Sequence, residues 1–262
     1  MQASSLLVLF LIQVLNLTRL TTFFTGFGDF MNIITAIRDD MLVPIHPAGW
    51  PFIGLFAAVT LVIGFFADGF FLIGVPATLW CVYFFRNPER ITPISPDLII
   101  APADGRIIAT GIEEAPAELG LPAGKWRCIC IFMNVFDVHV NRSPFAGTIG
   151  HQIYVKGKFV NASLDKAHHE NERMVQRLDT GDKRAPHIGI VQIAGLVARR
   201  ILCDVRVDDK LSAGQLFGII RFGSRVDVWV PEEIAPLVLV GQKTIAGETV
   251  LADLSGKRSG PR

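Results

Sequence analysis

The feature that most restricts how this chain can fold is an apolar run over residues 51–85, PFIGLFAAVTLVIGFFADGFFLIGVPATLWCVYFF, which carries one charge, Asp68, beside Gly69. Read as helices over residues 51–67 and 70–85, it gives two segments of about 24 to 26 Å at roughly 1.5 Å per residue. Each is just short of the apolar thickness of a bilayer, about 30 Å. We expect a tight helical hairpin through a slightly thinned membrane. A buried core hairpin or a re-entrant pair is the alternative.

Basic residues flank this apolar run on both sides but are missing from its turn. Arg38 precedes the run, and Arg86 and Arg90 follow it. Because basic residues near membrane spans are retained on the cytoplasmic side, both ends of the hairpin are expected there. We therefore expect a protein of the cell membrane whose remaining residues face the cytoplasm.

Composition agrees with membrane contact and argues against some partners. Hydrophobic residues make up 50% of the chain and charged residues 19%, against about 25% charged residues in soluble proteins. The net charge is +1 and no long basic run occurs, so nucleic acid is not an expected partner. The four cysteines have the spacing of neither a zinc site nor a disulfide framework. We expect no metal and a reduced compartment.

The chain divides into three expected parts. Residues 1–36 contain the apolar stretch SSLLVLFLIQVLNL, which lacks the charge and the cleavage site of a signal peptide. Two interpretations stay open. Residues 1–36 are a further membrane contact, or they include an extension and the native chain begins at Met31. Residues 37–90 hold the helical hairpin. Residues 91–262 consist of short apolar runs separated by turn residues, which predicts a mostly β domain, an antiparallel sandwich or barrel.

Within the β-rich part, the stretch IIRFGSRVDVWVP, residues 219–231, has the pattern of a strand interrupted by Gly223 and Ser224. A β-bulge or a tight bend explains a glycine in a strand without any function. A serine after a glycine can also act as a nucleophile, because glycine tolerates strained backbone and lets another group approach closely. The stretch lacks the G-x-S-x-G elbow of hydrolases. Attack on the preceding carbonyl is then the chemistry to consider.

Such an attack would cut the chain and convert the serine. An N-to-O acyl shift makes an ester at Gly223, and loss of the Ser224 α-proton eliminates that ester. Hydrolysis of the dehydroalanine left behind gives a pyruvoyl group and releases ammonia. Self-cleavage would thus make an electron-accepting carbonyl cofactor from an ordinary serine.

Two further motifs carry polar residues that suit catalysis. In APADGRI, Asp104 lies in an Asp-Gly turn that a purely structural role would also explain. In FDVHVNRSP, an extended strand would place Asp137, His139 and Asn141 on one face. An imidazole beside a carboxylate suits general acid–base work, with Asp137 and Asn141 in support. A solvated outer strand face would give the same pattern.

These motifs, with YFFRNPER, NASLDKA followed by NER, and RFGSRVDVWVP, occur in an order and spacing that resemble phosphatidylserine decarboxylases of the short, membrane-associated bacterial form. The resemblance extends from IRDDMLVPIH at residue 37 to ADLSG near the C-terminus. It implies a proenzyme cut between Gly223 and Ser224 into a β chain, residues 1–223, and an α chain, residues 224–262, held together as a heterodimer. It also implies conversion of phosphatidylserine to phosphatidylethanolamine.

The resemblance further implies roles for individual residues. Ser224 becomes the pyruvoyl group, which forms a Schiff base with the amine of the substrate. Asp104 matches an aspartate that assists processing, and His139 matches an active-site histidine. Long-form members carry a second histidine where this chain has Arg142. The resemblance therefore leaves the base for self-cleavage open. We assign this role to His139, the only histidine in the motif.

The polar segment NASLDKAHHENERM, residues 161–174, has no strand or helix period and is expected to form a loop over the head-group site. Its adjacent histidines, His168 and His169, are expected to be solvated because their spacing does not suit metal ligation.

Two alternatives to this function remain at the level of sequence. A membrane-tethered carrier similar to biotinyl or lipoyl domains would need a lysine at a hairpin tip, whereas Lys243 precedes its turn. A decarboxylase of the same type could also act on a different serine phospholipid. Acyl-chain preference and a higher oligomer are not readable from the residues.

Overall fold

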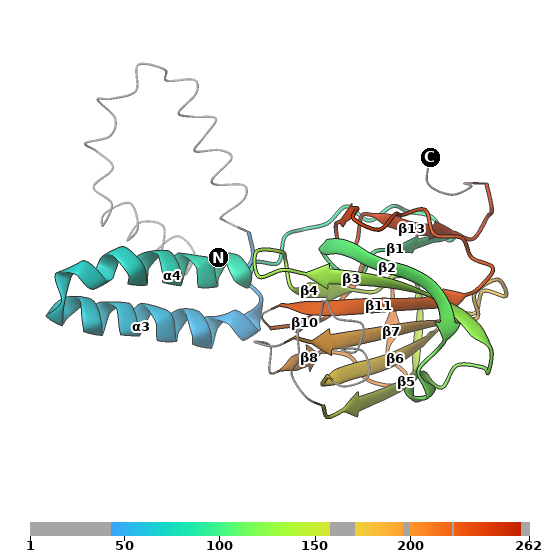
Figure 1. Ribbon diagram of the computed structural model, residues 1–262, viewed down its shortest axis with the longest axis horizontal. Coiled ribbons are helices and arrows are strands. Elements are labelled where there is room, and N and C mark those ends of the chain that lie inside the picture. The colour runs from blue at the N-terminus through green and yellow to red at the C-terminus, as the bar shows by residue number, and fades with distance from the viewer. Residues whose placement is uncertain (1–42, 158–170, 196–199, 222, 258–262) are drawn as a thin grey trace, which may run out of the picture. The chain divides into compact units, whose positions relative to one another are not determined.

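The computed structural model describes residues 43–157, 171–195, 200–221 and 223–257 (Figure 1). The chain divides into two compact units, Met1–Ile45 and His46–Arg262. All of the helices and strands given below belong to the second unit. The predicted part at residues 1–36 lies outside the described residues, and the predicted division at residue 90 stays a prediction.

Two apolar helices form the hairpin that the sequence predicts. A short 3-10 turn, η2 (Pro47–Gly49), leads into α3 (Trp50–Phe66), and η3 (Asp68–Phe70) connects α3 to α4 (Phe71–Phe84). The observed bounds agree with the predicted ones to within one residue. Pro47–Phe66 is long and apolar enough to cross a membrane, whereas α4 is shorter.

Small residues let the two helices approach each other. A Cβ atom on Gly74 would lie 2.7 Å from Thr60, and one on Gly64 would lie 2.4 Å from the ring of Phe71. Large apolar side chains point outward instead, among them Phe65 and Leu72, each 81% exposed. Close contact through small residues with apolar side chains outside is typical of helices in lipid and not of a hairpin in a protein core.

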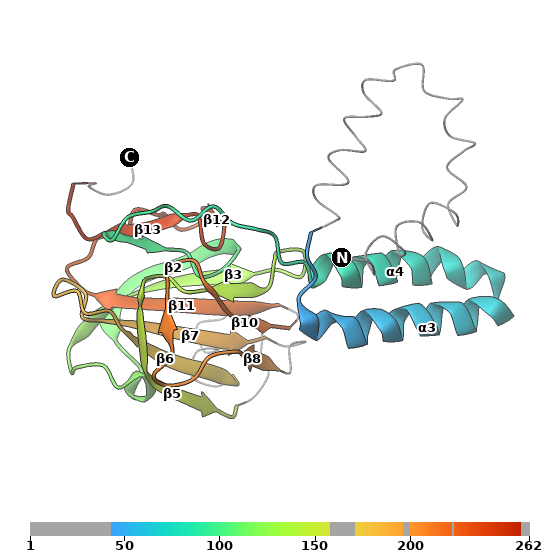
Figure 2. The ribbon, with the colours of Figure 1, turned by 180° about the vertical axis from the view of Figure 1, so that it is seen from behind.

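The strands form three antiparallel sheets (Figures 1 and 2). The eight-stranded sheet has the order β12 (Lys243–Thr244), β2 (Gly105–Glu114), β3 (Lys125–Met133), β11 (Ser224–Pro231), β7 (His187–Ala194), β6 (Arg173–Asp179), β5 (Gly147–Val155) and β9 (Lys210–Leu211). The three-stranded sheet has the order β4 (Val140–Arg142), β10 (Leu216–Ile220) and β8 (Ile201–Cys203), and β1 (Leu98–Ile100) pairs with β13 (Val250–Asp253). A 3-10 turn, η4 (Ala117–Leu119), follows β2.

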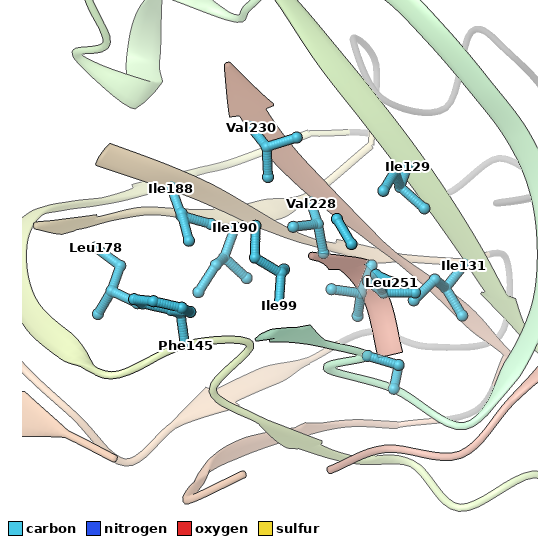
Figure 3. Close-up of a cluster of buried hydrophobic side chains, with 14 of the residues drawn as sticks. Ile99, Ile129, Ile131, Phe145, Leu178, Ile188, Ile190, Val228, Val230 and Leu251 are labelled. Atoms are coloured by element: carbon cyan, nitrogen blue, oxygen red, sulfur yellow. The ribbon is translucent and has the colours of Figure 1, made fainter. Parts of the chain in front are cut away.

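The main core lies between the curled eight-stranded sheet and the two smaller sheets. Ile190 and Val228 from the large sheet pack with Ile99 of β1 and Leu251 of β13 (Figure 3). A second apolar cluster lies on the opposite face of the large sheet, around Trp229. The predicted fold class, mostly antiparallel β with a helical hairpin before it, is confirmed.

The stretch over residues 219–231 is two strands and not one interrupted strand. Its first residues belong to β10 in the three-stranded sheet, and its last belong to β11 in the large sheet. Gly223 and Ser224 lie where the chain passes from one sheet to the other. The glycine therefore marks the point where the chain changes sheets. The sequence does not reveal this change, because apolar residues alternate on both sides of the glycine.

Candidate active site

Ser224 begins β11, and its hydroxyl group is buried without a partner. The residue pairs with Met133 of β3 on one side and with Ala194 of β7 on the other. Its side chain is fully buried, and Oγ has no hydrogen-bond partner among the residues that the structure describes. Because buried polar atoms are rarely left unsatisfied, an orphaned hydroxyl at this position needs a functional explanation.

Gly223 holds the junction in a conformation that suits glycine. Its φ angle is +66°, in the left-handed region that other residues adopt at a cost. A Cβ atom there would contact only Val135 Cγ1, at 3.9 Å. The glycine is thus required by the backbone angle and not by lack of space.

His139 is fully buried beside this junction. Its Nε2 accepts the backbone N–H of Gly223 at 3.2 Å, and its Nδ1 lies 2.9 Å from the carbonyl oxygen of Asp137. Since a carbonyl can only accept, Nδ1 carries the proton and Nε2 presents its lone pair to the junction. The ring also packs on Phe84, with 4.2 Å between centroids.

The surroundings of His139 keep its imidazole neutral. Burial lowers its pKa to about 4, and the positive charge of Arg86 acts in the same direction. The hydrogen bond to the Asp137 carbonyl opposes this shift but is weaker. A neutral imidazole with a directed lone pair, one peptide unit from Ser224, is suited to accept a proton.

Asp104 lies in the turn between β1 and β2 and is held from two sides. Its carboxylate accepts from Arg90 at 2.8 Å and from the backbone N–H of Ala246 at 2.7 Å. Burial raises its pKa above the ordinary value, although Arg90 and the Ala246 N–H lower it. Among the described residues, Asp104 makes no direct contact with His139 or Ser224, so any role in processing acts through a small movement or an intervening group.

The row of side chains expected from FDVHVNRSP does not form, because β4 begins only at Val140. Asp137 lies in a turn, where its carboxylate accepts from the backbone and side-chain nitrogens of Asn134 at 2.8 and 2.6 Å. The prediction that Asp137 shares one strand face with His139 and Asn141 was wrong. Asp137 instead orients His139 through its backbone carbonyl.

Asn141 is fully buried and belongs to a polar pair that sequence reasoning missed. Its Oδ1 accepts from Gln192 Nε2 at 2.8 Å, and its Nδ2 lies 3.7 Å from the sulfur of Met133. Met133 is the β3 neighbour of Ser224. Asn141 therefore supports the wall of the Ser224 site and not the imidazole directly.

Arg142 lies where long forms resemble this motif but carry a second histidine, and its side chain connects three separate segments. Its guanidinium donates to Asn87 Oδ1 at 2.9 Å and to the carbonyls of Pro88 and Gly214 at 3.0 and 3.1 Å. A guanidinium has no lone pair to accept a proton. The imidazole of His139 is thus the group at the junction that is suited to act as base.

The motif YFFRNPER, which the sequence analysis used for membrane orientation and for the family resemblance but not for the site, connects the other motifs. Its residues contact each motif in turn: Phe84 packs on His139, Arg86 donates to the carbonyl of Phe136, Asn87 accepts from Arg142, and Arg90 binds Asp104. The sequence offered one signal for these contacts: two arginines and an asparagine follow directly after the apolar helix. Exposure of these polar side chains to solvent would have been the simpler explanation.

Behind Ser224, on the opposite face of β11, lies a buried ionic cluster. Cys128, Cys130 and Asp227 place potential metal-ligand atoms within 4.8 Å of one another. Arg225 lies among them, its Nε 2.5 Å from Asp227 Oδ1 and its Nη2 2.8 Å from Cys130 Sγ. Burial raises the pKa of the Cys128 thiol well above its usual range. Arg225 thus forms a buried ion pair with Asp227 and also contacts Cys130.

Most of the predicted head-group loop, with His168 and His169, lies outside the described residues. The C-terminal end of this segment is described. There, Asn171 donates to the carbonyl of Ala194 at 2.7 Å. Glu172 is buried, and its Oε1 has no hydrogen-bond partner among the described residues. The backbone carbonyl of Glu172 accepts the N–H of Ala194 at 2.9 Å. Because Ala194 pairs with Ser224, the described end of the segment lies two strands from the serine.

Comparisons with known proteins agree with this arrangement. The sequence model of a family described as phosphatidylserine decarboxylase matches residues 77–252, which contain the second half of α4 and all of the strands except the last residue of β13. A curated protein of Beijerinckia indica, the phosphatidylserine decarboxylase proenzyme, is 49% identical over 223 residues, or 85% of this chain and 94% of that protein. Neither of these two matches is a biotinyl or lipoyl carrier, and Lys243 of β12 pairs with Arg106 of β2 instead of lying at a hairpin tip.

Proposed function

This chain belongs to the phosphatidylserine decarboxylase family and is a carboxy-lyase, and we propose that it matures by breaking its own Gly223–Ser224 bond. The product would be a pyruvoyl-dependent enzyme that converts phosphatidylserine to phosphatidylethanolamine. The observation that supports this most directly is the junction itself. A buried, unpartnered serine hydroxyl follows a left-handed glycine whose N–H contacts a neutral imidazole.

In the cleavage step, His139 acts as the base. Ser224 Oγ attacks the Gly223 carbonyl while Nε2 of His139 takes up the hydroxyl proton, and the amide bond is exchanged for an ester. Loss of the Ser224 α-proton then expels the Gly223 carboxylate. Hydrolysis of the dehydroalanine that remains releases ammonia. Asp104, fixed by Arg90 and by the N–H of Ala246, would assist through a small movement or an intervening group.

Position 224 fits a pyruvoyl group. The lack of a partner for Oγ among the described residues supports conversion of this residue to a carbonyl group, and the pairing of β11 with β3 and β7 holds the residue on both sides. When present, the group supplies a carbonyl that condenses with the substrate amine and accepts the electrons left by carbon dioxide.

We expect the chain to relay the proton that replaces carbon dioxide and to exclude bulk water during decarboxylation. Nε2 of His139 would take up a proton from solution and pass it to the carbon that carbon dioxide leaves. Phe84 and the buried wall formed by Met133 and Asn141 keep water away from the reacting carbon. Removal of water strengthens each polar contact within the site.

The hairpin would keep this site at the membrane that holds its substrate. We propose that α3 and α4 anchor the enzyme with both helix ends on the cytoplasmic face. Because a diacyl lipid stays in the bilayer, anchoring raises the local concentration of substrate at the site. The two chains formed by the cut, residues 1–223 and 224–262, would remain a heterodimer because β11, β12 and β13 pair with β3, β2 and β1.

The mass of the denatured protein tests this proposal. A fragment of residues 224–262, lighter by one ammonia than a chain that begins with serine, is expected from the purified protein. Ser224→Ala should give one uncut chain without decarboxylase activity. Recovery of full activity from that uncut variant would rule out the pyruvoyl mechanism.

A further inference from the structure

Two arginines lie opposite each other at the end of the β8–β10 pair. Ile220 pairs with Ile201, and the next residues along the two strands are Arg221 and Arg200. The N–H of Arg221 lies 3.4 Å from the carbonyl oxygen of Arg200, which continues the antiparallel register. Directly opposed residues have Cβ atoms about 5 Å apart, and like charges in such pairs are destabilising.

Neither guanidinium has an anionic partner among the residues that the structure describes. Nε of Arg221 is buried and makes no hydrogen bond. The pKa of Arg221 is lowered, first by burial and then by the charge of Arg200. The nearby carboxylate of Asp204 faces His46 instead, at 3.6 Å. Two adjacent cations, one of them with an unbonded Nε, favour an anion at this position.

Arg221 lies on the chain segment that leads to the proposed cleavage point, and Arg200 lies opposite it, directly before the neighbouring strand β8. Arg221 precedes Ser224 by three residues, and its guanidinium lies 4.8 Å from the ring centroid of Phe52, in the first turn of α3. Phe52 stacks on Phe85, whose neighbour Phe84 packs on His139. A continuous series of aromatic contacts thus connects Arg221 to the imidazole.

The same position lies at the end of the predicted membrane span. Pro47–Phe66 is long and apolar enough to cross a bilayer, and Trp50 at its start is half exposed. Tryptophan and arginine at helix ends are typical of the head-group level of a membrane. The phosphate groups of the lipids lie at this level.

We propose that Arg221 and Arg200 bind the phosphodiester group of the phospholipid substrate. The inference rests on the proposed function, because the amine of the substrate must reach residue 224. In a serine phospholipid, four bonds separate that amine from phosphorus, so a phosphate site must lie beside the junction. Arginine suits this role because its donors match two phosphate oxygens at once. The pair would select a phosphorylated serine over free serine.

Steady-state kinetics with dihexanoyl phosphatidylserine, which remains monomeric, tests the pair without a membrane. Arg221→Gln and Arg200→Gln should each raise KM by about tenfold or more, with kcat within about threefold. Arg221→Lys should recover part of the loss. Arg206→Gln, which removes an exposed arginine from a turn elsewhere, is the matched control. A KM equal to that of the control in both glutamine variants would overturn the proposal.

A second measurement tests the arginine site independently of the proposed self-cleavage. In the uncut Ser224→Ala background, binding of dihexanoyl phosphatidylglycerol, a phosphodiester without an amine, should weaken about tenfold on adding Arg221→Gln or Arg200→Gln. This result needs no cleavage, so it holds if self-processing fails. Unchanged binding there would refute the arginine site. If the variants lose only sedimentation with phosphatidylglycerol vesicles, the arginines bind neighbouring lipids and the substrate role is wrong.

Discussion

His139 Nε2 accepts the backbone N–H of Gly223 at 3.2 Å. The bond directs the lone pair of the imidazole to the residue whose carbonyl would be attacked by Ser224. The opposite ring nitrogen faces a backbone carbonyl, so the tautomer is fixed by the fold. A base of defined orientation is therefore in place before any cut.

Replacement of His139 by alanine is expected to slow self-cleavage by about 100-fold or more, a typical loss for a missing general base. The rate at which residues 224–262 appear, followed by mass or gel, measures it. Asp137→Asn is the matched control, because His139 contacts the backbone carbonyl and not the carboxylate of residue 137. A normal rate in His139→Ala would assign the base elsewhere.

Gly223→Ala tests the left-handed backbone at the junction. The new methyl group has room, with Val135 Cγ1 at 3.9 Å, but a φ of +66° costs a non-glycine residue about 1 kcal/mol. We expect slower cleavage with a folded protein, seen as delayed appearance of the small fragment beside an unchanged circular dichroism spectrum. Wild-type cleavage in this variant would show that the conformation is not required.

Asp104→Asn should destabilise the fold as well as slow processing. It leaves the guanidinium of Arg90 without its anionic partner in a nearly buried site, which costs about 2 kcal/mol or more. Urea unfolding in the uncut Ser224→Ala background measures this. Asp182→Asn, which breaks an exposed pair with Arg184, should move the midpoint far less. Equal midpoints would show that the Arg90 contact is not stabilising.

The low pKa of His139 predicts how stability depends on pH. Its folded pKa of about 4 lies below its unfolded value of 6.5, so the unfolded state binds the proton more readily between those values. The stabilisation is complete above pH 6.5 and is lost as pH falls toward 4, by about 2 kcal/mol between pH 7.5 and 5.

Urea unfolding of Ser224→Ala with and without His139→Gln, at both pH values, isolates this contribution. The glutamine variant should lose less stability on acidification, because residue 139 no longer titrates. Equal pH dependence in the two proteins would show that His139 is not held neutral by the fold.

Local patterns predicted the hairpin closely, because an apolar run with one charge allows few alternatives. They also singled out Ser224, His139 and Asp104 as candidates, through motifs whose order resembles one family, and the roles of these residues stay predictions. Local patterns failed at Asp137. The alternation of apolar and polar residues cannot distinguish a strand from the turn that Asn134 and Asp137 close. The change of sheet at Gly223 and the contacts of Arg90 and Arg142 depend on pairing between distant segments, which no local pattern records.

The central place of β11 has a consequence for the lifetime of the mature protein. If the chain is cut at Gly223, the strand that begins the small fragment is already enclosed between β3 and β7. Once unfolded, the two pieces would have to find each other before that strand could be inserted again. The mature enzyme would then owe its persistence to a slow unfolding rate, whereas its precursor could refold as a single chain.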